Sequence, residues 1–176
     1  GTGGGGGVAL KWCRPPPPRA RLDECFGRGC TDEVLLRAVM RAVKATGLRH
    51  CFHCERTATF QAMQRQLEAA GRMTGRAHAE SRPPVVEELS VAIVLALAED
   101  LGARVQVVHC SSPRSARLAR DARWRGVDAT VETCAPYLFF SDEALDRPGP
   151  AGTCHPPPRG EADVRGGAHC LRRGAQ

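Results

Sequence analysis

The sequence contains no long hydrophobic run, few lysines and few aromatic residues. Its apolar stretches fall far short of the ~20 residues that a membrane-spanning helix needs, so we expect no membrane partner. No charged segment leads into an apolar one with a small-residue cleavage site, and we therefore expect no secretory signal. Of the 25 Lys and Arg residues, only Lys11 and Lys44 are lysine. This arginine bias, in a chain with 19 Gly and 13 Pro, makes the net charge of +6 weak evidence for nucleic-acid binding.

Paired cysteine motifs are also scarce, although the chain has nine cysteines. The one C-x-x-C, from Cys51 to Cys54, has no second C-x-x-C that would complete a four-ligand zinc site. The cysteines are scattered, their number is odd, and the chain is larger than the usual disulfide-stabilised scaffolds. We therefore expect most of them to be reduced thiols packed as small hydrophobic residues, which is typical of a cytoplasmic protein.

Short apolar segments alternate with amphipathic ones along the middle of the chain. In the clearest helix, Val86, Leu89, Ile93 and Leu97 recur at helical spacing, and Gly102 ends it. We expect strands over 8–13, 49–54, 104–109 and 127–133, and helices over 33–46, 57–70, 85–101 and 113–126. Such alternation predicts βαβ units, and hence an α/β fold with a parallel sheet.

The remaining segments carry weaker signals. We expect a loop from residue 71 through Ser81–Pro84, and Ser112 to cap the helix that begins at Pro113. After residue 133 the pattern fades into a Pro- and Gly-rich loop and a polar, helix-like tail. The predicted organisation is a Gly-rich tract over 1–7, one domain over 8–160 and a polar C-terminal tail over 161–176.

Three side chains stand out because each lies at or near the carboxyl end of a predicted strand. They are Lys11, His53 and His109. In (β/α) barrels, side chains at these strand ends converge on the active-site face. Two imidazoles are common ligands of divalent metals, and a lysine amine that becomes N-carboxylated can join them. Each residue also has an ordinary interpretation: a lone lysine at a strand end usually reaches solvent, and a lone histidine is usually a hydrogen-bonded core or loop residue.

Six segments, in order along the chain, resemble motifs of the cyclic amidohydrolases, the family of allantoinase, dihydroorotase and hydantoinase. The resemblance spans about residues 5–165 and is most marked for allantoinases. The segments are Gly7–Lys11 (G-x-x-x-K), His53–Glu55 (H-[CA]-E), Ser81–Glu88 (S-R-P-x-x-x-E), Val107–Ser112 (H-x-S-S), Val131–Leu138 (E-T-C-P-H-Y-L) and Cys154–Arg159 (C-x-P-P-x-R).

This resemblance implies a fold, a reaction and a set of metal ligands. The fold is part of a TIM (β/α)8 barrel, about strands 4 to 7 with their helices. Family members are soluble homo-oligomeric hydrolases that open a ring amide, as in purine breakdown, with two zinc ions bridged by a carboxylated lysine. Lys11 matches that lysine, and His53 and His109 match two histidine ligands. A hydroxide attacks the ring carbonyl, and an Asp after the last strand shuttles the proton.

The sequence departs from the family pattern in several places. It has no H-x-H pair and no S-D-H segment, so the proton-shuttle Asp is missing, and Asp163 in the tail is no substitute. Ala135-Pro136-Tyr137 stands where P-H-Y is expected. A closed barrel takes about 250 residues, and this chain has 176. We therefore expect a truncated chain that is inactive alone and that self-associates through its open sheet edges.

Several alternatives stay open at this stage. The ring substrate fits allantoin best, with dihydroorotase or hydantoinase activity as the nearest enzyme alternatives. A non-catalytic fragment or paralogue that acts through protein–protein contacts is an alternative of another class. His78-Ala79-Glu80 imitates an H-x-E metal motif, but we expect it on a surface loop. We also expect the arginines of 114–125 to form the solvent face of a helix and not a nucleic-acid interface.

Overall fold

The part of the chain that the structure describes forms one four-stranded parallel sheet in the order β1-β2-β3-β4. The computed structural model describes residues 9–11, 33–146 and 154–174, so the Gly-rich tract predicted over 1–7 lies outside the described residues. The strands are β1 (Ala9–Lys11), β2 (Arg49–Phe52), β3 (Val105–Val107) and β4 (Ala129–Val131). Each strand pairs with the next one along the chain, which confirms the predicted parallel α/β arrangement.

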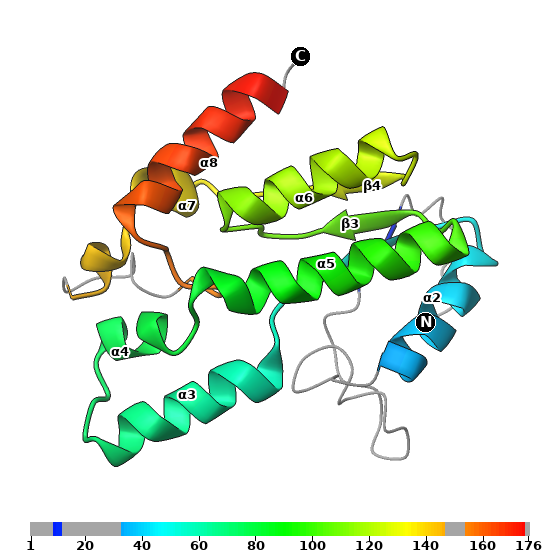
Figure 1. Ribbon diagram of the computed structural model, residues 1–176. Helices are drawn as coiled ribbons and strands as arrows, with labels where there is room; N and C mark the ends of the chain where they lie inside the picture. Colours follow the sequence, from blue (N-terminus) through cyan, green and yellow to red (C-terminus); the bar gives the residue numbers. More distant parts are fainter. Residues whose placement is uncertain (1–8, 12–32, 147–153, 175–176) are drawn as a thin grey trace.

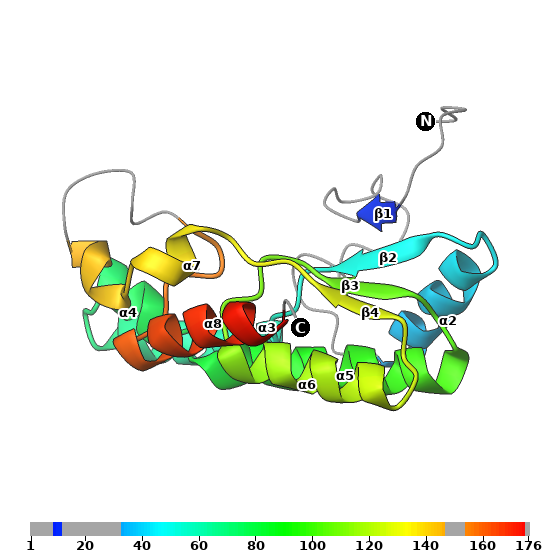
Figure 2. The same cartoon turned by 90° about the horizontal axis from the view of Figure 1, so that it is seen from above.

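Helices follow the strands in sequence and gather on one face of the sheet. Figure 2 shows α2, α5 and α6 along that face, and α4 and α7 beyond the carboxyl ends of the strands. The helices are α2 (Glu33–Lys44), α3 (Thr57–Ala69), α4 (Gly75–Glu80), α5 (Pro84–Leu101), α6 (Pro113–Trp124), α7 (Pro136–Phe139) and α8 (Glu161–Gly174), with a 3-10 turn η1 (Asp142–Asp146). No helix in the described ranges is both long enough and apolar enough to cross a membrane.

The main core lies between the sheet and α5, the longest helix in Figure 1. Val91 and Leu95 of α5 are buried against Phe52 of β2 and Val107 of β3, in a single apolar cluster. Gly102 ends α5 in the left-handed conformation at φ +61°, as the sequence predicts, because a residue without a Cβ adopts it at little cost. Because α5 packs against both β2 and β3, it fixes the positions of these two strands, whose carboxyl ends lead into the predicted site.

The structure corrects some element boundaries. The expected loop over residues 71–84 contains α4, whose first amide groups are capped by Thr74: its hydroxyl accepts from the backbone N–H of Ala77 at 3.2 Å. Residues 136–139 form α7. Strands β2, β3 and β4 are shorter than predicted, because the ladder pairs only three or four residues of each, while the ends of the strand predicted over 8–13 lie outside the described residues. Ser112 caps α6 as predicted.

Candidate metal centre

His53 and His109 meet at the carboxyl ends of β2 and β3. Phe52 and Val107, the last residues of these strands, are paired in register, and the histidines follow them by one and two residues. Nδ1 of His53 lies 2.9 Å from Nε2 of His109, and the two rings meet edge to face with centroids 4.7 Å apart. Two nitrogen donors from segments 56 residues apart are therefore directed at each other.

Glu55 holds the other side of the His53 ring. Its Oε2 lies 3.1 Å from Nε2 of His53, and its side chain is only 5% exposed. Burial opposes ionisation of Glu55, yet the hydrogen bond from His53 and the positive charges of Arg159 and Arg82 hold the pKa of this carboxyl below its usual value. The ionised carboxylate accepts a hydrogen bond, which assigns the proton of a neutral His53 ring to Nε2 and leaves the lone pair of Nδ1 facing His109.

This arrangement fits a divalent metal as two of its ligands. Imidazole nitrogens are ordinary ligands of such ions, and a ligating histidine typically donates its other N–H to a carboxylate, as His53 does to Glu55. Within the described ranges, no group of three or more His, Cys, Asp and Glu side chains is arranged to hold a metal ion. The two histidines therefore need further donors to complete a coordination shell.

Lys11, the third predicted ligand, ends β1, which pairs with β2 in the sheet. Its Cα partner there is Cys51, two residues before His53. The backbone thus places Lys11 at the same end of the sheet as His53, one strand away. The side chain of Lys11 lies outside the described part of the structure, so its role as a ligand stays a prediction.

His78 is not on a surface loop, and the expectation that placed it there is wrong. It lies in α4, half-buried, with Nδ1 3.0 Å from Nη1 of Arg82 and its ring edge-on to His155. Burial, with help from the charges of Arg82 and His155, lowers the pKa of His78 to about 4, so its ring is neutral at pH 7. Glu80 forms an ion pair with Arg72 instead. His78 and Glu80 therefore contact different partners, a buried Arg82 and an exposed Arg72, and do not form a metal motif.

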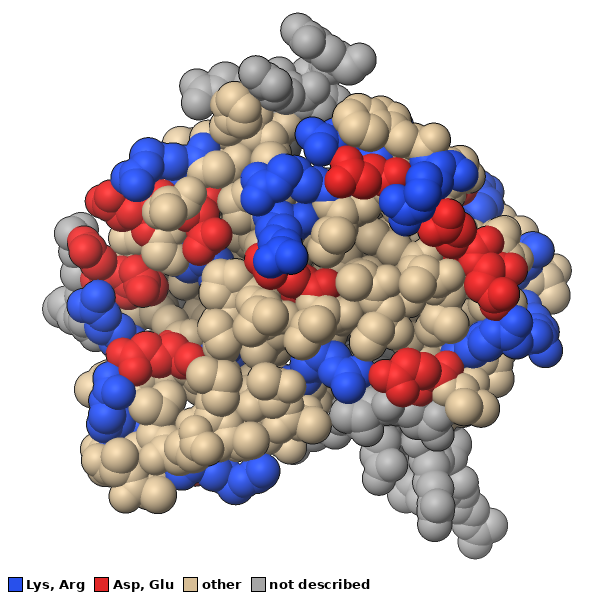
Figure 3. All heavy atoms as spheres, in the orientation of Figure 1, with Lys and Arg blue, Asp and Glu red and all other residues tan. Residues whose placement is uncertain are grey.

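The arginines of α6 face solvent, as predicted, while Ala119 and Ala122 are buried beneath them. Arg114 lies 3.6 Å from Glu88 in an ion pair, and Arg125, which follows the helix, pairs with Glu99 of α5. Figure 3 shows basic and acidic side chains interspersed over this side of the molecule. The charges on this face are therefore mixed in sign.

Sequence reasoning assigned no role to Glu55, although it lies within one of the motifs. The available signal was a carboxylate two residues after a histidine at a strand end, a spacing that lets both side chains reach the same rim. That signal alone does not specify which atoms meet, because the loop after β2 sets the direction of each side chain.

The comparisons with known proteins agree on one group of enzymes. No family model matches the chain. The chain is 37% identical over 161 residues to the allantoinase of Rubrobacter xylanophilus, a match that covers 82% of this chain and 36% of that protein. It is 36% identical over 146 residues to the D-hydantoinase of Rhizobium radiobacter, which covers 81% and 32%. A solved D-hydantoinase structure superposes with a TM-score of 0.76 at 33% identity, over 84% of this chain and 33% of that one.

The chain thus spans about a third of the length of the relatives that it matches. Its four parallel strands with their helices correspond to part of a barrel, which confirms the fold expected from the sequence motifs. Named relatives at this level of identity and the shared fold agree with the six motifs. Over about four fifths of its length, this chain is similar to the cyclic amidohydrolases named allantoinase and D-hydantoinase.

Proposed function

We propose that this chain forms the central part of a metal-dependent hydrolase that opens cyclic amides, and that its substrate class is the hydantoin ring of allantoin. The observation that carries the proposal is the 2.9 Å approach of the His53 and His109 nitrogens at the carboxyl ends of adjacent parallel strands. In barrels of this class the reaction takes place at that end. Similarity to proteins named allantoinase favours the allantoin ring, and similarity to proteins named D-hydantoinase keeps a related hydantoin as the alternative, beside dihydroorotase activity.

The proposed metal is zinc, with Lys11, His53 and His109 as ligands from this chain. When bound, such an ion polarises a ring carbonyl and lowers the pKa of a coordinated water to about 7. His53 would offer Nδ1 and His109 would offer Nε2, the two atoms that already face each other. Glu55 would keep the proton on Nε2 of His53, so that the ligating nitrogen stays free of it. Lys11, in its N-carboxylated form, would be the third ligand from this chain.

We further propose that the chain is inactive alone. Its sequence contains no H-x-H pair and no S-D-H segment, so the remaining ligands and the proton-shuttle Asp must come from other strands of the barrel. The cysteines that the structure describes are free thiols, which is consistent with the proposed cytoplasmic location. In that compartment the complete enzyme would act in purine-nitrogen breakdown as a homo-oligomer.

Two measurements test this proposal. The first is hydrolysis of allantoin, hydantoin and dihydroorotate by a version of the protein with the flanking barrel strands restored. We expect metal-dependent ring opening with allantoin as the best substrate, and no turnover by the 176-residue chain. Loss of turnover in His53→Ala and His109→Ala, but not in an exposed control such as His169→Gln, would support the ligand assignment. Absence of turnover for every ring amide would refute the proposed activity.

The second is metal analysis of the 176-residue chain itself. We expect bound zinc that is lost in His109→Ala. A chain that binds no zinc, and whose full-length version hydrolyses nothing, would instead favour a non-catalytic protein that acts through protein contacts.

A further inference from the structure

A buried carboxylate supports the loop that follows His109. Glu87, in the first turn of α5, is 1% exposed. Its Oε1 accepts the backbone N–H of Ser112 at 3.0 Å, and its Oε2 accepts the backbone N–H of Ser111 at 3.1 Å. Oε2 also accepts the Ser111 hydroxyl, and the Cys110 thiol donates to Oε1 at 3.4 Å. One side chain therefore binds each of the three residues that follow His109.

Arg159 completes this buried network. It is 4% exposed, its Nε donates to the hydroxyl oxygen of Ser111 at 2.9 Å, and its Nη1 donates to the backbone carbonyl of Arg82. Its Nη2 lies 3.5 Å from Oε2 of Glu87. Two charges this deeply buried are tolerated only when they are paired and hydrogen-bonded. The network thus ties together three of the motif segments, 81–88, 107–112 and 154–159.

The loop that Glu87 binds begins at an unusual backbone conformation. Within the part of the chain that the structure describes, His109 is the one non-glycine residue with a positive φ, at +42°. A left-handed conformation at a residue with a Cβ costs about 1–2 kcal/mol and persists only when its surroundings enforce it. On the β4 side, the N–H of Cys110 donates to the carbonyl of Glu132 at 2.7 Å, and the Thr133 hydroxyl donates to the carbonyl of Cys110 at 2.7 Å. On the α5 side, Glu87 provides the hydrogen bonds.

We propose that Glu87 is a positioning residue for the candidate metal centre. By accepting the N–H groups of Ser111 and Ser112 it holds His109 in the left-handed conformation, and that conformation directs the His109 imidazole at Nδ1 of His53. The meaning of this geometry for metal binding rests on the proposed function. The geometry itself does not, and it can be measured on the metal-free chain.

The test compares the 176-residue chain with its Glu87→Gln variant, using Glu99→Gln as the matched control on the exposed end of the same helix. Glutamine keeps the size of the side chain but replaces one acceptor oxygen with a donor group that faces other donors. Heteronuclear NMR of the histidine rings reports the tautomer of His109 without metal. Competition with a chromophoric chelator reports the zinc affinity. Thermal unfolding separates both from a loss of fold.

We expect a single, fixed His109 tautomer in the parent and in Glu99→Gln, and averaged tautomers in folded Glu87→Gln. Zinc affinity should fall about 10- to 100-fold in Glu87→Gln, the range typical of residues that orient metal ligands, and stay within about twofold in the control. Unchanged ring signals and unchanged zinc affinity in a folded Glu87→Gln chain would overturn the proposal.

Two further outcomes are decisive. If Glu87→Gln does not fold, Glu87→Asp decides, because it keeps the charge but is one methylene shorter, which draws the carboxylate away from the N–H groups of Ser111 and Ser112. A His109 tautomer that is fixed in the parent and averaged in that variant supports the positioning role, and one that is unchanged overturns it. If the parent binds no zinc, the proposed metal centre fails, while the ring spectra of the metal-free chains still decide the role of Glu87.

Discussion

At the scale of the residue, His50 shows how burial controls a proton. It lies in β2, is 2% exposed, and packs its ring against Phe52 with centroids 3.9 Å apart. Burial lowers the pKa of His50 from 6.5 to about 4, so the folded protein keeps this ring neutral where the unfolded chain would protonate it. Because the folded pKa is the lower one, the contribution of His50 to stability is complete above pH 6.5 and is lost as the pH falls towards 4.

This gives a pH prediction for a single residue. Between pH 7 and pH 4, His50 alone should lower the free energy of unfolding by about 3 kcal/mol, since one pKa unit corresponds to about 1.4 kcal/mol. Urea titrations at a series of pH values measure the effect. His50→Leu should flatten the pH dependence by that amount, whereas His169→Gln, at an exposed position of α8, should leave the parent's dependence intact. Equal slopes in His50→Leu and the parent would contradict the assignment.

The residues of the candidate site differ in how visible they are in the sequence. His53 and His109 could be selected because each directly follows an apolar segment, and in-register pairing of Phe52 with Val107 brings them to one rim. Glu87 could not be placed, because its partner Ser111 lies 24 residues away and the contact depends on a turn at His109 that no spacing rule specifies. The Lys11 assignment rests on the strand position and the motif alone.

At the scale of the element, α8 contains two adjacent glycines in different surroundings. A Cβ on Gly166 would lie 2.8 Å from Cγ of Pro113, whose ring cannot move far, whereas a Cβ on Gly167 would meet Cδ2 of Leu138 at an ordinary 3.5 Å. Alanine in a helix interior is favoured over glycine by about 1 kcal/mol. We therefore expect Gly167→Ala to raise the free energy of unfolding by about 0.5–1 kcal/mol and Gly166→Ala to lower it. Denaturant titrations of both variants measure these changes. If both variants changed the free energy of unfolding in the same direction, the close contact with Pro113 of α6 would not require glycine at position 166.

The cap of α6 offers a second test at this scale. The Ser112 hydroxyl accepts from the N–H of Arg114 at 3.2 Å and donates to Glu88 at 2.8 Å. Ser112→Ala removes both hydrogen bonds and should cost about 1 kcal/mol of unfolding free energy, measured by thermal or urea unfolding. Ser112→Asp retains the acceptor but places its charge beside Glu88, so it should recover only part of the loss. A loss below the error of the titration in Ser112→Ala would contradict a capping role.

Elements were predictable where their signals are local. Ser112 before Pro113 marks the start of α6, and Gly102 marks the end of α5. The helix α4 was missed because its six residues are too few for a repeating apolar pattern. Its position depends instead on close packing against η1. A Cβ added to Gly75 would lie only 2.7 Å from the carbonyl oxygen of Leu145, so a residue without a side chain is needed at this contact. This contact joins residues 70 positions apart, so the sequence near residue 75 could not predict it.

At the scale of the whole molecule, the sheet formed by residues 9–11, 33–146 and 154–174 ends on both sides without a further paired strand. β1 and β4 are its outer strands, and the relatives that the chain matches extend over about three times the matched length. The segment from β4 into the residue after α7 exposes Val131 at 38%, Phe139 at 75% and Phe140 at 42%. Open strand edges and clustered exposed apolar side chains both favour association. In a closed barrel, neighbouring strands pair with such edges.

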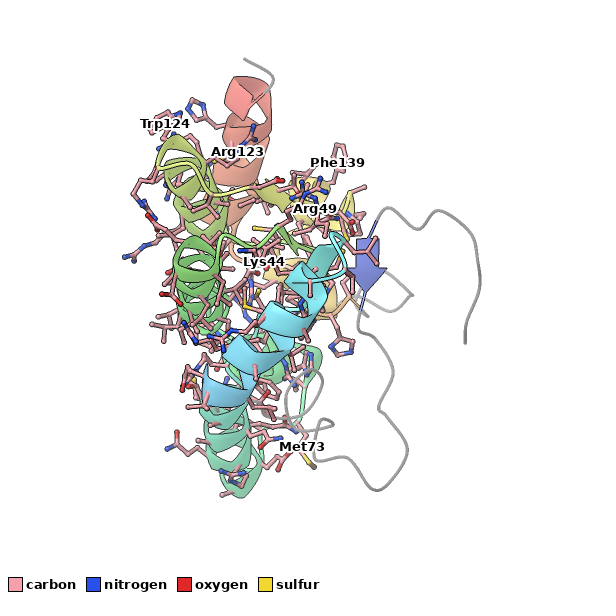
Figure 4. The ribbon with its side chains drawn as sticks, turned by 90° about the vertical axis from the view of Figure 1, so that its right-hand side faces the viewer. Lys44, Arg49, Met73, Arg123, Trp124 and Phe139 are labelled. Carbon is pink, nitrogen blue, oxygen red and sulfur yellow. The ribbon has the colours of Figure 1, made fainter. Side chains whose placement is uncertain are left out.

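We therefore expect the 176-residue chain to self-associate reversibly, and Phe139→Asp to weaken that association by placing a charge on the apolar segment after β4. Sedimentation velocity at increasing protein concentration measures the shift from larger species to monomer. Trp124→Asp is the matched control: this aromatic is 77% exposed but belongs to α6, where Arg120 stacks on it, and Figure 4 places it on the opposite side of that view from Phe139. Equal weakening by both substitutions would indicate general surface hydrophobicity. A parent chain that stays monomeric at every concentration would show that the open edges are protected within the chain itself.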